Sequence, residues 1–252
     1  MTLLGSAAAA SAIAGPAGAP SGAADDPKCY SAVVNEWICK DYFVDRQDEL
    51  IAATREHLAI TIAAVLLGLV LAIPLALLAR RSARVEGAVL GFCTGVYTIP
   101  SLALFPLIVP FTGLSRTTVI IGLALYSLTI LVRNTTEGLR GVPDEVIESA
   151  TGLGYSKTRL LLRIELPLAL PVIMAGLRIA TVSTVALTTI GALVAYGGLG
   201  NLLYNGVTTD FRAQVLAASL ICVAIAVLLD GLLLLVQKGL TPWTRGGSRR
   251  PA

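Results

Sequence analysis

Residues 148–167 read Glu-Ser-Ala-Thr-Gly-Leu-Gly-Tyr-Ser-Lys-Thr-Arg-Leu-Leu-Leu-Arg-Ile-Glu-Leu-Pro, a polar island inside an otherwise hydrocarbon-like chain. The pattern predicts two short helices joined by a turn. A membrane protein has no structural need for a charged hairpin of this length between two spans, so we expect the segment to meet a partner in water. We refer to residues 138–167 as the polar loop.

The composition around this loop is that of a membrane protein. The 252-residue chain is 55% hydrophobic and only 14% charged, with a mean hydropathy of +0.78. A soluble domain of this length is less apolar and more charged, so we predict an all-α protein that crosses the cell membrane several times. The net charge of +3 has no clustered basic face behind it, and no nucleic-acid partner is predicted.

Five windows are long and apolar enough to cross a bilayer, which takes about 20 residues per helix. The third window is short and the fourth is long. They run roughly over residues 58–79, 85–109, 117–132, 168–196 and 215–236.

The loop charges orient these spans, because Lys and Arg collect on the cytoplasmic side. Basic residues follow the first, third and fifth spans, whereas the N-terminal segment is acidic. We therefore predict an N-out, C-in topology with the polar loop inside. The inside residues are Arg80, Arg81, Arg84, Arg133, Arg140, Lys157, Arg159, Arg163, Lys238, Arg245, Arg249 and Arg250.

The spans divide the chain into three parts. Residues 1–53 are expected to form an extracytoplasmic tail and an amphipathic lead-in, residues 54–240 the transmembrane domain, and residues 241–252 a cytoplasmic tail. The first 24 residues fit a flexible tail best, since they lack Lys and Arg and contain Gly and Pro. A poor signal peptide and an additional weak span remain as alternatives.

Cysteine, histidine and carboxylate residues carry little signal for chemistry. Cys29 and Cys39, ten residues apart in the outer segment, either form a disulfide or stay free. Cys93 and Cys222 lie within apolar spans, where we expect them to pack in the way that small hydrophobic side chains do. His57 is expected to be an interfacial residue, and the lone carboxylate Asp230 a packing or interfacial one. His57 lies at the start of the first span and Asp230 near the inner end of the fifth.

The second span contains features that shape a helix. Proline residues at 100, 106 and 110 remove backbone donors, and they predict that its outer half bends and lines a cavity. Gly87, Gly91 and Gly95 recur every four residues and predict a smooth stripe for close helix packing.

Local signals set the limits of the two helices in the polar loop. Pro143 is expected in the first turn, followed by two acidic residues that favour a helix N-terminus. Gly152 and Gly154 predict its end, and Ser156 the cap of the second helix. Pro167 is expected to end the hairpin and to begin the fourth span.

The polar loop resembles the EAA loop of permease subunits of type I ATP-binding-cassette importers. That pattern is Glu-Ala-Ala, three residues, Gly, nine residues, Ile, one residue and Leu-Pro. Ser149 replaces the middle alanine, a small-for-small change. The matching positions are Glu148, Ala150, Gly154, Ile164, Leu166 and Pro167.

The resemblance implies the permease fold and a coupling helix that fits a groove on a separate ATPase subunit. Glu148 would pair with a basic group of that partner, Ala150 would permit close approach and Gly154 would make the turn. The alternative is an ordinary amphipathic hairpin at the membrane surface. Thr151 and Ser156 stand where a P-loop needs glycine, so the chain is expected to bind no ATP, to need no cofactor and to be no enzyme.

Beyond the loop, residues 55–240 are similar to permeases of the osmoprotectant branch, which import glycine betaine, choline, carnitine or proline. Residues 97–104, 125–134, 178–191 and 197–200 carry the similarity. The fourth span is rich in hydroxyl groups that either bond their own helix or line a wet translocation pathway. A pathway free of fixed charge would suit a zwitterion. The hydroxyl residues are Thr181, Ser183, Thr184, Thr188 and Thr189.

The same resemblance implies the partners: ATP-binding-cassette ATPase subunits, an extracytoplasmic substrate-binding protein and a second permease copy or homologue, all assembled at membrane lipid. An importer of methionine or another small amino-acid-like solute is the alternative within transport. A membrane scaffold that docks a cytoplasmic protein is the alternative from another class. A membrane enzyme is least favoured, because no nucleophile and base pattern occurs in the spans.

Overall fold

The computed structural model describes residues 27–243, so the tail predicted for the first 24 residues and all but the first three residues of the tail predicted for 241–252 lie outside that range. Within it the regular elements are helices and no strand occurs. Four helical stretches are long and apolar enough to span a membrane, and a bent pair makes a fifth. This agrees with the predicted all-α fold and its five spans.

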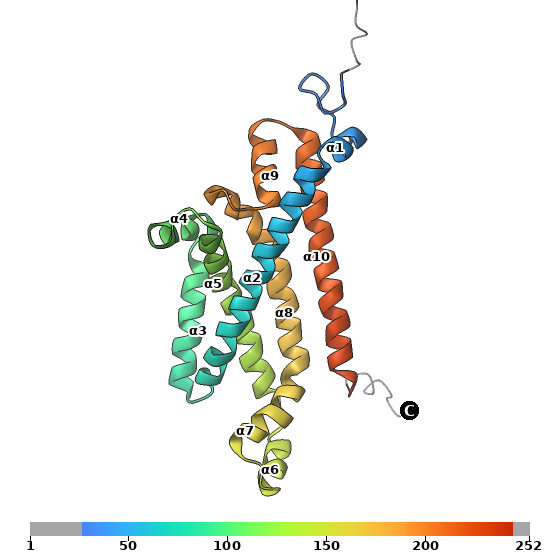
Figure 1. Cartoon of the computed structure of the whole chain (residues 1–252). Coiled ribbons are helices and arrows are strands. Elements are labelled where there is room, and N and C mark those ends of the chain that lie inside the picture. The colour runs from blue at the N-terminus through green and yellow to red at the C-terminus, as the bar shows by residue number, and fades with distance from the viewer. Residues whose placement is uncertain (1–26, 244–252) are drawn as a thin grey trace, which may run out of the picture.

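The straight spans stand side by side in Figure 1. They are α2 (Gln47–Ala79), α5 (Arg116–Arg140), α8 (Leu166–Thr188) and α10 (Arg212–Leu240). Helix α2 begins eleven residues before the predicted start at 58, so the last seven residues of the expected lead-in belong to the same helix. At 1.5 Å per residue its 33 residues are about 50 Å long, more than a hydrocarbon core of about 30 Å requires.

The second predicted span is the bent pair. Helices α3 (Ala83–Thr98) and α4 (Ser101–Thr112) meet at 101°, and Figure 1 shows α4 lying across the end of α3. The cause is Pro100, because a residue before proline avoids the helical region, and Ile99 is extended with φ −66° and ψ 126°. The predicted bend is confirmed, although it is sharper than a kink within one helix.

Helix α5 lies at the centre of the bundle. It packs along α2, α3 and α8, and its buried residues include Leu123, Leu131 and Val132. In contrast, a Cβ atom added to any glycine of the predicted α3 stripe meets nothing within 4 Å. That stripe therefore faces outward from the chain rather than into its own core.

The polar loop extends beyond one end of the bundle (Figure 1). Helix α6 (Asp144–Gly152) is followed by α7 (Lys157–Leu160) and a π turn over Leu161–Glu165 that runs directly into α8. Pro167 lies in the first turn of α8, as predicted for the start of the fourth span, but it does not end the hairpin, because the helical run continues through it. Proline clashes with the carbonyl group four residues back in a regular α-helix, and the π turn covers that carbonyl, Arg163, so the helix continues.

The opposite end contains a helix that the sequence did not predict. The expected fourth span was to reach residue 196, but α8 ends at Thr188 and a 3₁₀ turn continues to Val194. The chain then reverses and forms α9 (Leu199–Thr208), which packs beside α10, while the short α1 (Lys40–Asp45) contacts α2 and α10. Gly198, with φ +55°, lies so close to α2 that a Cβ atom on it would be 2.6 Å from the backbone nitrogen of His57.

Candidate functional site: the polar loop and the hydroxyl-rich helix

The turn of the polar loop is built by glycine and two backbone hydrogen bonds. Gly154 has φ +83°, a conformation that other residues avoid. The Tyr155 N–H donates to the Ala150 carbonyl at 3.2 Å, and the Gly154 N–H to the Thr151 carbonyl at 2.9 Å. This is a Schellman motif, and the Ser156 hydroxyl then accepts from the Arg159 N–H and caps α7. The predicted turn and cap are therefore present.

The six residues that match the EAA pattern occupy different environments. Glu148 and Gly154 are exposed, Ala150 is buried against the rest of the hairpin, and the last three positions of the pattern are half-buried. Among these six positions, one carboxylate and one glycine turn are therefore presented to solvent. Leu153, between the two glycines, is 79% exposed and was missed by the sequence reasoning. Val146 and Leu162 of the same hairpin are also exposed, so its apolar side chains together offer a surface that a partner can bury.

An ion pair ties the base of the hairpin to the end of the first span. The Arg80 guanidinium donates to both carboxylate oxygens of Glu165, at 2.5 and 3.0 Å, although the two residues are 85 positions apart. Glu165 is only 5% exposed. The hydrogen bonds that Arg80 donates to the Glu165 carboxylate raise the pKa of Arg80 above its ordinary value. The hairpin is therefore held to α2 by this ion pair and to α8 by the continuous helix.

The hydroxyl groups of α8 are largely used within the helix itself. The hydroxyls of Thr181, Thr184 and Thr188 donate to the backbone carbonyl four residues back, and that of Thr189 donates to Ala186. Thr188 also contacts the Thr61 hydroxyl of α2 at 3.0 Å.

Ser183 differs from these threonines because it lines a cavity that none of them lines. It borders a cavity of about 460 Å³ between α8 and α10 and a smaller one of about 20 Å³ beside Tyr97 and Tyr126. Tyr97 is therefore the point where the bent second span meets a cavity, and its ring lies 5.8 Å from that of Tyr126.

Two charged residues face the larger cavity. Arg178 donates to both oxygens of Asp230, each at 2.8 Å. Asp230 was expected to be a packing or interfacial residue, and Arg178 was not singled out as a site residue. An arginine in the middle of an apolar span is itself a signal of function, so the sequence contained the clue. The wall of this cavity therefore carries two fixed charges, whereas the translocation pathway considered from the sequence was free of fixed charge.

His57 is not an interfacial residue. It is fully buried, with Nε2 3.0 Å from the Val185 carbonyl and Nδ1 3.2 Å from the Gly197 carbonyl. The Val185 carbonyl is open to it because α8 changes to a 3₁₀ turn, in which the Thr189 N–H donates to Ala186 instead. His57 thereby joins α2, α8 and the loop before α9.

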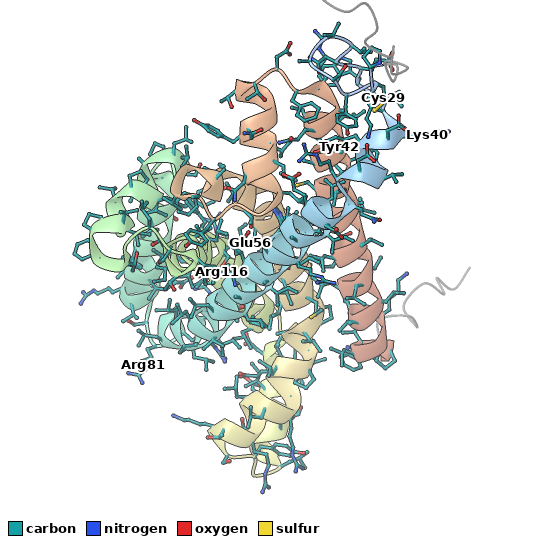
Figure 2. All side chains as sticks on the ribbon, turned by 45° about the horizontal axis from the view of Figure 1, so that its top comes forward. Cys29, Lys40, Tyr42, Glu56, Arg81 and Arg116 are labelled. Carbon is teal, nitrogen blue, oxygen red and sulfur yellow. A yellow bond between two sulfur atoms is a disulfide. The ribbon has the colours of Figure 1, made fainter. Side chains whose placement is uncertain are left out.

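The outer segment is folded onto the same end of the bundle. Cys29 and Cys39 are bonded through sulfur, with Cα atoms 5.6 Å apart. Asn35 hydrogen-bonds to the Asp210 carbonyl and to the Arg212 N–H, which holds the segment against the turn before α10. Figure 2 shows Cys29 and Tyr42 at this end and Arg81 away from it, and it shows Glu56 close to Arg116, to which it is paired at 3.7 Å.

Apolar spans that carry one protruding polar hairpin define a multi-pass membrane subunit built to dock a partner. A family model described as "Binding-protein-dependent transport system inner membrane component" matches residues 59–246, and the chain belongs to this family. It is therefore an inner-membrane permease, whose family implies an ATPase partner and a second permease subunit.

Relatives in the osmoprotectant group are similar over most of their length. The glycine betaine/carnitine/choline permease OpuCB of Bacillus subtilis is 33% identical over 77% of this chain and 89% of that protein. The osmoprotectant import permease OsmW of Salmonella typhimurium is 37% identical over 80% and 96%. The ergothioneine permease and binding protein EgtU of Helicobacter pylori is 44% identical over 54% of this chain but 24% of that protein.

Solved structures confirm the fold. The inward-facing MetNI methionine transporter superposes with a TM-score of 0.68 over 79% of this chain and 97% of the matched chain. The identity is 21%, so this similarity identifies the type I importer permease fold and says nothing about the solute.

Proposed function

We propose that the chain forms the translocation pathway of an ATP-driven importer of small zwitterionic or quaternary-ammonium osmoprotectants. The observation that carries the proposal is the geometry of the polar loop. Its first helix and Schellman turn expose Glu148 and Leu153, and its second arm is continuous with a helix that enters the membrane. Family membership and the named osmoprotectant permeases among the relatives support it.

In this proposal a separate ATPase subunit hydrolyses ATP and grips the polar loop. Glu148 pairs with a basic group there, Leu153 enters an apolar recess, and the small residue Ala150 lets the backbones approach. The continuous run Lys157–Val194 is 38 residues long, about 57 Å by the α-helical rise. It acts as a lever that carries closure of the ATPase to the hydroxyl-rich part of α8.

The remaining partners belong to the same proposal. A substrate-binding protein delivers the solute to the outer end, where the segment bonded through Cys29 and Cys39 lies. A second permease copy or homologue completes the pathway within the lipid, with the polar loop in the cytoplasm. The hydroxyls of Thr181, Ser183, Thr184, Thr188 and Thr189 face or support that pathway, the threonines chiefly by shaping α8.

Uptake by the complete transporter tests the proposal. The permease, its ATPase and its binding protein are reconstituted in liposomes, and ATP-dependent uptake of labelled glycine betaine, choline and carnitine is compared with that of methionine. Uptake of the quaternary-ammonium solutes is expected. Uptake of methionine alone would move the chain to the amino-acid branch, and absence of any ATP-coupled uptake would favour a docking scaffold.

Ergothioneine is a second candidate solute. The higher identity to EgtU over part of the chain favours it, and ergothioneine is also a trimethylammonium zwitterion. Including labelled ergothioneine in the same uptake series separates it from the osmoprotectants.

A further inference from the structure

The Arg178–Asp230 ion pair lies at membrane depth. Arg178 is 13 residues beyond Glu165 along one continuous helix, which places it about 20 Å from the Arg80–Glu165 pair at the hairpin base. A hydrocarbon core is about 30 Å thick, so the pair lies inside it. Ionised side chains at this depth are rare, and they face a bundle interior or a water-filled cavity.

The pair is open to its surroundings. The side chains of Arg178 and Asp230 are 26% and 35% exposed, in the wall of the cavity of about 460 Å³ that Ala175, Ile179, Val182 and Ser183 complete. Charges exposed to hydrocarbon are costly, so this side of α8 and α10 does not face lipid.

The other side of the same two helices has the opposite character. A groove of about 220 Å³ between α2, α8 and α10 is lined by leucine, isoleucine and valine side chains and two threonines, with no charged residue. Leu177 and Leu229, the direct neighbours of the ion pair in sequence, line this groove. Helices α8 and α10 therefore separate an apolar side, suited to lipid, from a charged side, suited to a polar solute.

The chemistry of the pair matches a zwitterion. The planar guanidinium of Arg178 binds a carboxylate with two hydrogen bonds, and the Asp230 carboxylate attracts an ammonium group. Glycine betaine and carnitine carry both charges, whereas choline has the ammonium group only. A zwitterion that enters the cavity can exchange partners with the ion pair without any change in net charge, which allows it to bind and also to leave.

Resting on the proposed function, we propose that Arg178 and Asp230 form a permease subsite for the zwitterionic solute. Arg178 binds the carboxylate of the solute and Asp230 faces its quaternary ammonium group, while Ser183 borders the cavity toward the two tyrosines. The pair thereby selects carboxylate-bearing solutes over simple ammonium cations after the binding protein has released them.

The test compares glycine betaine and choline uptake by the reconstituted complete transporter. In Arg178→Gln, uptake of glycine betaine relative to choline is expected to fall about tenfold, because one charged hydrogen-bonding interaction is lost. Asp230→Asn is expected to reduce uptake of both solutes. Arg116→Gln, which alters an ion pair at the outer end far from the cavity, serves as the control and keeps the wild-type ratio.

A double variant keeps the test decisive if a single substitution prevents folding. Arg178→Gln/Asp230→Asn leaves no unpaired charge, so the protein is expected to assemble, and its preference for glycine betaine should be lost. A wild-type ratio in either Arg178 variant would overturn the subsite. The subsite would also be overturned if a variant made the two permease subunits dissociate while the ratio of glycine betaine to choline uptake stayed unchanged. The ion pair would then be a contact between subunits. If the wild-type transporter carries neither solute, the proposed function itself fails.

Discussion

The carboxylate of Glu165 binds the guanidinium of Arg80 through two hydrogen bonds, and so fastens the base of the polar loop to the cytoplasmic end of α2. The hairpin therefore cannot move as a free appendage. Its second arm is already continuous with α8, and the ion pair adds the first span to the same rigid unit.

Breaking this pair is expected to uncouple the hairpin from α2. In Glu165→Gln the neutral amide leaves Arg80 without its charged partner, and the free energy of unfolding should fall by about 2 kcal/mol. Thermal melting of the purified protein and ATP-coupled uptake both measure the effect. The matched control is Glu49→Gln, from an exposed pair with Arg46 that should be worth little. Equal effects of the two substitutions would show that the buried pair has no special role.

Reversal of charge at Glu148 tests the docking surface. Glu148→Arg is expected to leave the protein folded in the membrane but to abolish ATP-coupled uptake, because the exposed carboxylate forms no hydrogen bond or ion pair with residues 27–243 and repulsion would replace attraction at the ATPase. Co-purification of the ATPase with the permease gives a direct measure. Glu145→Arg, also exposed on α6, is the control and should retain more binding. Wild-type uptake by Glu148→Arg would remove the docking assignment.

Substitution at the Gly154 turn should act through the backbone. The site is open, so Gly154→Asp meets no steric obstacle, but φ +83° costs a residue with a Cβ atom about 1–2 kcal/mol. We expect a normally inserted protein with a distorted hairpin and no ATP-coupled uptake. Gly152→Asp, in open space with ordinary φ, should retain more activity. A fully active Gly154→Asp variant would contradict the role of the turn.

His57 is expected to stabilise the outer end of the bundle. His57→Phe removes the imidazole N–H that one of the Val185 and Gly197 carbonyls accepts and places a larger ring at a fully buried site, and it should lower the free energy of unfolding by about 2 kcal/mol. His57→Gln retains a donor and should lose less. Thermal unfolding measures both variants, with the exposed neighbour Arg55→Gln as the control. An unchanged melting temperature in His57→Phe would mean that water replaces the imidazole.

The outer segment should respond to acid through Asp45. Lys28 and Tyr30 donate hydrogen bonds to its carboxylate and lower the pKa of Asp45 below its ordinary value. A lowered pKa in the folded state adds stability above the unfolded-state pKa of about 4, and that stability disappears as the pH falls through the lower folded value. Asp45→Asn should therefore increase proteolysis of residues 28–46 at pH 7, and the difference from wild type should disappear as the pH falls below the lowered pKa of Asp45. Equal proteolysis of wild type and variant at pH 7 would argue against the contact.

The sequence by itself determined the features that depend on neighbouring residues. Hydropathy over each window set the number of spans, because the bilayer requires a certain apolar length whatever the neighbouring helix. The turn at Gly154 and the cap at Ser156 followed from local backbone preferences, and so did the bend at Pro100. The family resemblance was readable for the same reason, since the EAA pattern lies within one continuous segment.

Tertiary structure alone decided which distant groups meet. Hydropathy does not state how a helix is rotated about its axis, and that rotation brings Arg178 to Asp230, Arg80 to Glu165 and His57 to Val185. Two of the predicted helix boundaries moved for local structural reasons. Packing of Gly198 against α2 turns the chain back into α9, and the π turn absorbs Pro167 and makes hairpin and span one lever.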